Sequence, residues 1–138
     1  MFKKILAPVD LYHADKLDKA LTATGELARV YGAEVCYVGV TGSTPSELAR
    51  TPEQYARKLK EFAREQGEKF GVTTSSHTIV SHDPAVQMNH ELAAAVEDVG
   101  ADLIVMATHP PDVTDYLWSG NGAHLAAHSD ASVMLIRG

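Results

Sequence analysis

The chain has 138 residues, which suits a single domain spanning 1–138 that can bury a core without disulfides or metal ions. Its 12 basic and 18 acidic side chains give a formal charge of -6, which argues against nucleic-acid binding because that function relies on clustered lysine and arginine. No apolar run approaches the ~20 residues of a membrane span, and the first residues show no secretory-signal pattern. The single cysteine cannot form an intramolecular disulfide. Together these features favour a cytoplasmic protein.

Short apolar runs alternate with helical patterns along the chain. The helical patterns cover 16–31, 51–70 and 83–99, and a fourth helix includes 124–128. Strands separated by helices favour a parallel sheet with helices on both faces, so we expect an α/β fold. Five strands are predicted: four from the apolar runs 4–9, 34–40, 102–107 and 132–137, and one from the threonine- and valine-rich segment 73–80.

Residues with capping chemistry mark the expected helix ends. Asp15 is expected to cap the first helix, and Thr51 the second, with Pro52 at its first position. Pro84 is expected to begin the third helix. Glycines that can end helices in the left-handed conformation follow the first three of them: Gly32, Gly71 and Gly100.

Small and polar residues follow the strands at the edge where open parallel sheets bind ligands. Asp10 follows the first strand, and Thr108 follows the fourth. The segment 119–122 comes directly before the last helix, and a helix N-terminus offers backbone N–H groups to a phosphate. The alternative is that Asp10 and Asn121 only cap the segments after them.

Five segments of the chain carry a resemblance to known proteins: Ile5 to Asp10, Tyr37 to Val40, Asp83-Pro84, Ala101 to His109 and His128 to Arg137. In their order and spacing they resemble the universal stress protein family over nearly the whole chain. The resemblance implies a Rossmann-like (adenine nucleotide alpha hydrolase-like) five-stranded parallel sheet in the order 3-2-1-4-5. It also implies a homodimer formed through the terminal strand, Ser132–Arg137.

Many members of that family bind ATP, so the resemblance implies a site for ATP or another adenine nucleotide, with or without magnesium. The adenine would lie between Asp10, Val40 and Met106. The phosphates would lie near the end of the fourth strand and the start of the last helix. The residues implied to contact the nucleotide are Pro8, Asp10, Val40, Met106, Ala107, Thr108, His109, Gly120, Asn121 and Gly122.

The loop after the fourth strand departs from the family's ATP motif, G-x2-G-x9-G-[S/T]. Pro110 and Val113 stand in place of the first two glycines, while Gly120 is kept and Asn121 replaces the usual serine or threonine. A proline has no N–H and a fixed φ, so this loop offers fewer donors to a phosphate. The segment instead resembles a variant branch of the family that also contains nucleotide binders.

Three functions therefore stay open. The first is a stress-response or regulatory protein that binds an adenine nucleotide as a sensor. The second is a nucleotide-free dimeric interaction protein with a vestigial site, whose partner would contact the loop 41–50. The third is a slow ATP hydrolase that needs magnesium and Asp10, although efficient hydrolysis would need more metal-anchoring and water-orienting groups.

No catalytic or metal-ligating residue is assigned. Of the histidines that invite a metal hypothesis, His124 and His128 are one helical turn apart, and no cysteine or acid is patterned with them. Surface positions are the expectation for the group His13, His82, His109, His124 and His128. Cys36 lies inside the second strand and is expected to be a small buried apolar residue.

Overall fold

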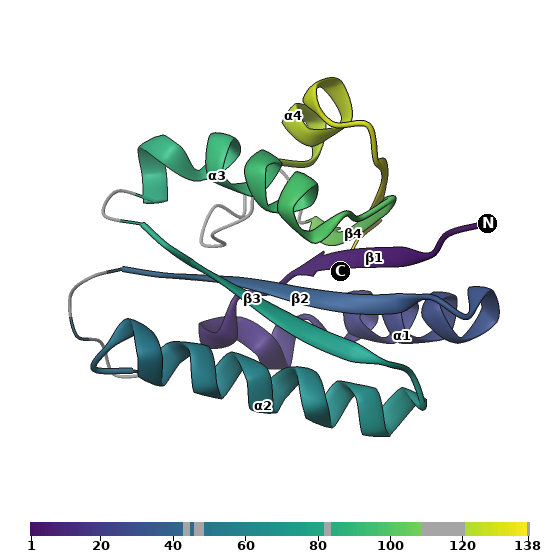
Figure 1. Ribbon diagram of the computed structural model, residues 1–138, viewed down its shortest axis with the longest axis horizontal. Helices are drawn as coiled ribbons and strands as arrows, with labels where there is room; N and C mark the ends of the chain where they lie inside the picture. The colour runs from purple at the N-terminus through teal and green to yellow at the C-terminus, as the bar shows by residue number, and fades with distance from the viewer. Residues whose placement is uncertain (43–44, 46–48, 82–83, 109–120, 138) are drawn as a thin grey trace.

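The computed structural model describes residues 1–42, 45, 49–81, 84–108 and 121–137, and only the backbone at 84–89 and 121 (Figure 1). Its strands form one five-stranded parallel sheet in the order β3-β2-β1-β4-β5, which confirms the expected fold. No helix among the described residues has the length and apolar character needed to cross a bilayer. The strands are β1 Lys4–Pro8, β2 Glu34–Thr41, β3 Thr74–Val80, β4 Leu103–Thr108 and β5 Ser132–Arg137.

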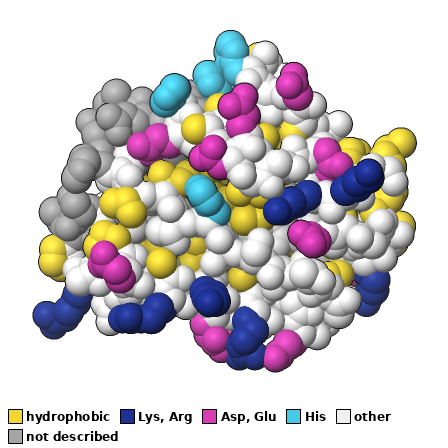
Figure 2. All heavy atoms as spheres, in the orientation of Figure 1, with side chains coloured by type: hydrophobic (Ala, Val, Ile, Leu, Met, Phe, Trp, Pro, Cys, Tyr) yellow, Lys and Arg dark blue, Asp and Glu magenta, His cyan; other side chains and the backbone are white. Residues whose placement is uncertain are grey.

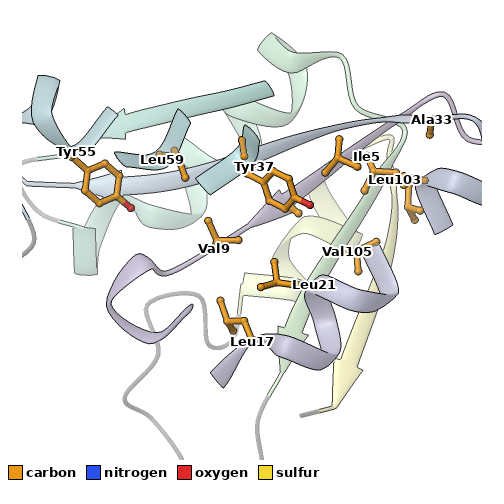
Figure 3. Packing of buried hydrophobic residues seen from close by; sticks show 14 of the residues in the cluster. Ile5, Val9, Leu17, Leu21, Ala33, Tyr37, Tyr55, Leu59, Leu103 and Val105 are labelled. Atoms are coloured by element: carbon orange, nitrogen blue, oxygen red, sulfur yellow. The ribbon is translucent and has the colours of Figure 1, made fainter. Parts of the chain in front are cut away.

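Helices cover both faces of the sheet. In Figure 1, α3 and α4 lie above it and α1 and α2 lie below. Alternate residues of β1 pack into the hydrophobic clusters on the two faces of the sheet. Ile5 and Ala7 lie on the α1 and α2 side, and Leu6 lies on the α3 and α4 side. Figure 3 shows the cluster on the α1 and α2 side, which includes Tyr37 and Leu59. The helical segments are η1 Leu11–Lys16, α1 Asp18–Tyr31, α2 Pro52–Phe70, α3 Pro84–Val99 and α4 Asn121–His128.

The helix ends confirm most of the predicted caps. The Thr51 side chain accepts a hydrogen bond from the Gln54 N–H at 3.1 Å, and Pro52 follows it in the first turn of α2. The glycines after α1, α2 and α3 have positive φ angles of 64° at Gly32, 67° at Gly71 and 75° at Gly100.

The cap predicted at Asp15 is wrong. Asp15 lies inside η1, a 3-10 helix that the sequence analysis did not anticipate, and α1 begins at Asp18 without a side-chain cap. Asp10 caps η1 instead. The N-cap position of α1 is Leu17, so Asp15 lies two residues before the position from which it could cap that helix.

Candidate functional site

The carboxyl ends of β1, β2 and β4 meet at one edge of the sheet. The central strand β1 pairs with β2 on one side, where Pro8 is aligned with Val38, and with β4 on the other. The order of the strands reverses between β1 and β4, so this is the edge where an open α/β sheet places its ligand. The fold therefore brings Pro8, Asp10, Val40, Ala107 and Thr108 to the edge that the sequence analysis predicted.

Asp10 is nearly buried at this edge, with 6% of its surface exposed. Its Oδ1 accepts a hydrogen bond from the Tyr12 N–H at 3.0 Å, and its Oδ2 lies 2.8 Å from Nδ1 of His13. Asp10 thus caps η1, as the alternative interpretation of this residue proposed. Each carboxylate oxygen carries a further lone pair, so the cap leaves accepting capacity for a ligand.

Tyr55 of α2 is a site residue that the sequence analysis missed. Its hydroxyl makes a hydrogen bond with the backbone of Val40, and its side chain is buried. Burial raises the pKa of Tyr55, and the nearby Asp10 and Tyr12 raise that pKa further, so the phenol stays neutral. Tyr55 therefore holds the end of β2 in place beside Asp10.

Gly39 makes this contact possible. A Cβ on Gly39 would lie 2.5 Å from the phenol oxygen of Tyr55 and 3.2 Å from a methyl group of Leu59. A glycine inside a strand often marks such a close approach. Gly39 is therefore the feature of the sequence from which a side chain packed closely over β2 could have been inferred.

The end of β4 offers two kinds of residue. Met106 is 1% exposed and packs among Val40, Ile79 and Leu125 on the α3 and α4 side of the sheet. Its side chain contributes to the core beneath the edge. Ala107 and Thr108 are partly exposed, and Thr108 brings a hydroxyl group to the edge.

The N-terminus of α4 lies close to the sheet because Gly122 has no side chain. A Cβ on Gly122 would stand 2.5 Å from Cδ2 of Leu135 in β5. In the sheet, Leu135 is aligned with Met106 of β4, so the first turn of α4 lies over the strand next to the candidate site. The predicted contacts His109 and Gly120 lie outside the described residues, as do Pro110 and Val113.

The described histidines and the cysteine form no metal-binding cluster at this edge. The rings of His124 and His128 lie 4.3 Å apart on α4, and no described group of three histidine, cysteine or acidic side chains is placed to hold a metal ion. Cys36 is buried, as predicted, and burial raises the pKa of its thiol. A buried thiol with a raised pKa is a poor nucleophile.

Comparisons with known proteins agree on one family. The family model described as "Universal stress protein family" matches residues 1–137. Universal stress protein G of Shigella flexneri is 26% identical over 145 residues, which cover 99% of this chain and all of that protein.

Solved structures show the same fold. A universal stress protein from Archaeoglobus fulgidus matches with a TM-score of 0.67 and 19% identity over 99% of both chains. A structure from that organism in complex with dAMP matches with a TM-score of 0.66 and 18% identity over 97% of both chains. A family protein from Arabidopsis thaliana with AMP bound matches with a TM-score of 0.65 and 15% identity, over 98% of this chain and 91% of that one.

Proposed function

Since the chain belongs to the universal stress protein family, we propose that it is a regulatory protein of the stress response that binds an adenine nucleotide. The observation that carries this proposal is the meeting of Asp10, the Val40 backbone and the end of β4 at the reversal point of the sheet. Structural neighbours solved with dAMP and AMP support an adenine nucleotide as the class of ligand.

The adenine and ribose would lie over the ends of β1 and β2. In this arrangement the Asp10 carboxylate accepts hydrogen bonds from the nucleoside, and the Val40 backbone contacts the base. Two features support it, because Asp10 is held by two local hydrogen bonds and the Val40 backbone by Tyr55. Groups that are already positioned lose little entropy when a ligand binds.

The phosphates would lie between the end of β4 and the start of α4. Thr108 offers a hydroxyl, and the first backbone N–H groups of α4 have no partner within the helix. We propose ATP as the ligand, with or without magnesium. The full set of proposed contacts is Pro8, Asp10, Val40, Met106, Ala107, Thr108, His109, Gly120, Asn121 and Gly122.

Binding at this edge would act as a sensor. A ligand that binds only the folded state adds about 2.7 kcal/mol of stability when its concentration is one hundred times its Kd. That free energy can shift a conformational or oligomeric equilibrium without any chemical step. A cytoplasmic location fits the unpaired, buried Cys36.

The experiment that tests the function examines the protein before and after its ligands are removed. Mass spectrometry of small molecules released from freshly purified protein is combined with calorimetric titration of ATP, AMP and GTP into the stripped protein. We expect a co-purifying adenine nucleotide or micromolar binding of ATP, and much weaker binding of GTP. No nucleotide, and no heat at millimolar ATP or AMP, would overturn the proposal.

The second candidate function is a dimeric interaction protein whose nucleotide site is vestigial. The exposed apolar surface of β5 favours it, because Leu135 is 50% exposed on an edge strand. Unpaired edge strands of this kind invite pairing with another chain. Both candidates include a homodimer through Ser132–Arg137, so the nucleotide measurements above separate them.

A further inference from the structure

The edge of the sheet opposite β5 is formed by β3, and β2 is its one partner among the described strands. The pairing begins with the Val35 N–H donating to the Thr73 carbonyl at 3.0 Å and ends with the Ser81 N–H donating to the Thr41 carbonyl at 3.0 Å. Because a parallel ladder uses every second residue of a strand, the odd-numbered residues of β3 bond to β2.

The even-numbered residues consequently turn their backbone groups outward. The N–H and carbonyl groups of Thr74, Ser76 and Thr78 point away from the sheet, and no described strand pairs with them. In Figure 1, β3 crosses in front of β2 with α2 running beneath it. This edge thus presents a row of hydrogen-bonding groups of the kind that a further strand can use.

Basic side chains of α2 flank this edge. A groove of about 780 Å³ runs between α2 and β3. Three cations and one acid of α2 line one side, and Thr74 and Ser76 line the other. These charged residues of α2 are Arg57, Lys60, Glu61 and Arg64. Figure 2 shows lysine and arginine side chains along the lower margin of this face, over α2. Cations thus outnumber acids in the lining of the groove, on a chain whose formal charge is -6.

Two of these cations are available to a ligand. Arg64 is bound to Glu61 and Glu68 on its own helix. No described carboxylate lies within ion-pair distance of Arg57 or Lys60. An incoming carboxylate at these two positions would therefore gain a partner without breaking an existing pair.

We propose that the free edge of β3 and the basic groove beside it form a docking site for an extended acidic segment of another protein. The segment adds to the sheet as a strand alongside β3. Its backbone bonds to the outward groups of Thr74, Ser76 and Thr78, and its acidic side chains meet Arg57 and Lys60. In strand addition the backbone hydrogen bonds supply affinity and the alternate side chains supply specificity.

The charges argue against a second copy of this chain as the occupant. A symmetric β3-to-β3 dimer would place the same surface of both subunits face to face. Arg57 and Lys60 of both subunits would then be brought into one interface, and like charges gathered there weaken it. The apolar β5 edge carries no such penalty, which leaves β3 for a different partner.

The test uses the full chain and a fluorescent peptide of about eight residues that alternates valine and glutamate, near the usual length of a strand. A peptide that alternates valine and lysine is the control ligand. Fluorescence anisotropy is expected to show binding of the acidic peptide alone, with a Kd that rises as salt screens the charges. No binding of the acidic peptide at millimolar protein would overturn the proposal.

Charge reversal tests the role of the groove. We expect the double variant Arg57→Glu/Lys60→Glu to weaken binding of the acidic peptide by about tenfold or more. The matched control is Lys3→Glu/Arg29→Glu, which makes the same change in net charge at exposed positions away from the groove. Equal losses of peptide affinity in the two double variants would mean that only the net charge of the protein matters, and would overturn the proposed docking site.

Backbone variants test strand addition itself. Ser76→Pro removes an outward N–H and spares the bonds to β2, whereas Ser76→Val keeps that N–H. We expect only the proline variant to lose binding. If both bind equally while the charge reversal still abolishes binding, the groove is a polyanion site and strand addition is wrong.

Amide hydrogen exchange gives a measurement that does not depend on the proline variant folding. In the unmodified protein, the acidic peptide is expected to slow exchange at Ser76 and Thr78 relative to the valine–lysine peptide. Unchanged exchange at these amides in the bound state would also overturn strand addition.

Discussion

The hydroxyl of Tyr55 occupies the space that a side chain on Gly39 would need. The two residues lie on α2 and β2, and a Cβ on Gly39 would be 2.5 Å from that oxygen. Both Tyr55 and the neighbouring Leu59 are buried, so neither can swing into solvent to make room. This contact fixes the spacing between α2 and β2 at the place where the Val40 backbone reaches the candidate site.

We expect Gly39→Ala to destabilise the protein by about 1–3 kcal/mol, the usual cost of adding a methyl group to a filled core. Chemical denaturation followed by circular dichroism measures the change. The double variant Gly39→Ala/Tyr55→Phe removes the closest clashing atom. Its loss of unfolding free energy should therefore be smaller than the sum of the losses in the two single variants. Strict additivity would contradict the proposed contact.

Two buried tyrosines should respond differently to loss of their hydroxyl groups. Tyr37 buries a hydroxyl with no hydrogen-bond partner among the described residues, whereas the hydroxyl of Tyr55 bonds to the Val40 backbone. We expect Tyr37→Phe to be neutral or to stabilise the fold, and Tyr55→Phe to destabilise it by about 1–2 kcal/mol. Denaturant unfolding of the two variants checks this prediction. Equal losses of unfolding free energy would show that both hydroxyls make hydrogen bonds in the folded protein.

The same tyrosines predict loss of stability in alkaline solution. Burial raises the pKa of Tyr37 in the folded protein above its value in the unfolded chain, which is about 10. Above that pH the unfolded chain loses its proton more readily, so the free energy of unfolding falls as pH rises. We expect a shallower fall between about pH 9 and pH 11 for Tyr37→Phe than for the unmodified protein, measured by denaturant unfolding.

The strand positions were predictable because the sheet is parallel and buried on both faces. The buried strands β1, β2 and β4 appear as apolar runs. The bounds of the more exposed edge strand β5 are also the predicted ones. The edge positions of Asp10, Val40 and Thr108 followed, since the carboxyl ends of parallel strands share one edge. These inferences need only local patterns and the order of the elements.

Contacts between layers were not predictable in the same way. In the sequence, Tyr55 is one of several apolar residues on the buried face of α2. Its hydrogen bond to the Val40 backbone depends on how α2 packs against β2. Asp15 has the chemistry of a cap, but it lies inside η1, and Asp10 is the residue that caps η1. Local propensity could not decide between two acids that are both suited to capping.

Substitution of Asp10 can separate its capping role from ligand binding. Asp10→Asn keeps an oxygen that can accept from the Tyr12 N–H, so we expect it to cost less than about 1 kcal/mol of stability. It removes the negative charge, and we expect the affinity for ATP in calorimetry to fall by about tenfold or more. The control His13→Ala leaves the carboxylate in place and removes only one of its local hydrogen bonds, so it should weaken ATP binding much less than Asp10→Asn. Unchanged affinity in Asp10→Asn would mean that Asp10 is only a cap.

The exposed edge of β5 predicts how the proposed homodimer can be broken. Leu135 is half exposed on this strand, and a charged side chain there would have to be desolvated in a symmetric interface next to its counterpart. We expect Leu135→Lys to raise the dimer dissociation constant by about tenfold or more, measured by analytical ultracentrifugation. Val30→Lys is the matched control, because Val30 is 78% exposed on α1, outside this edge. If Leu135→Lys stays dimeric while Val30→Lys dissociates, the interface lies on the α1 side of the molecule instead.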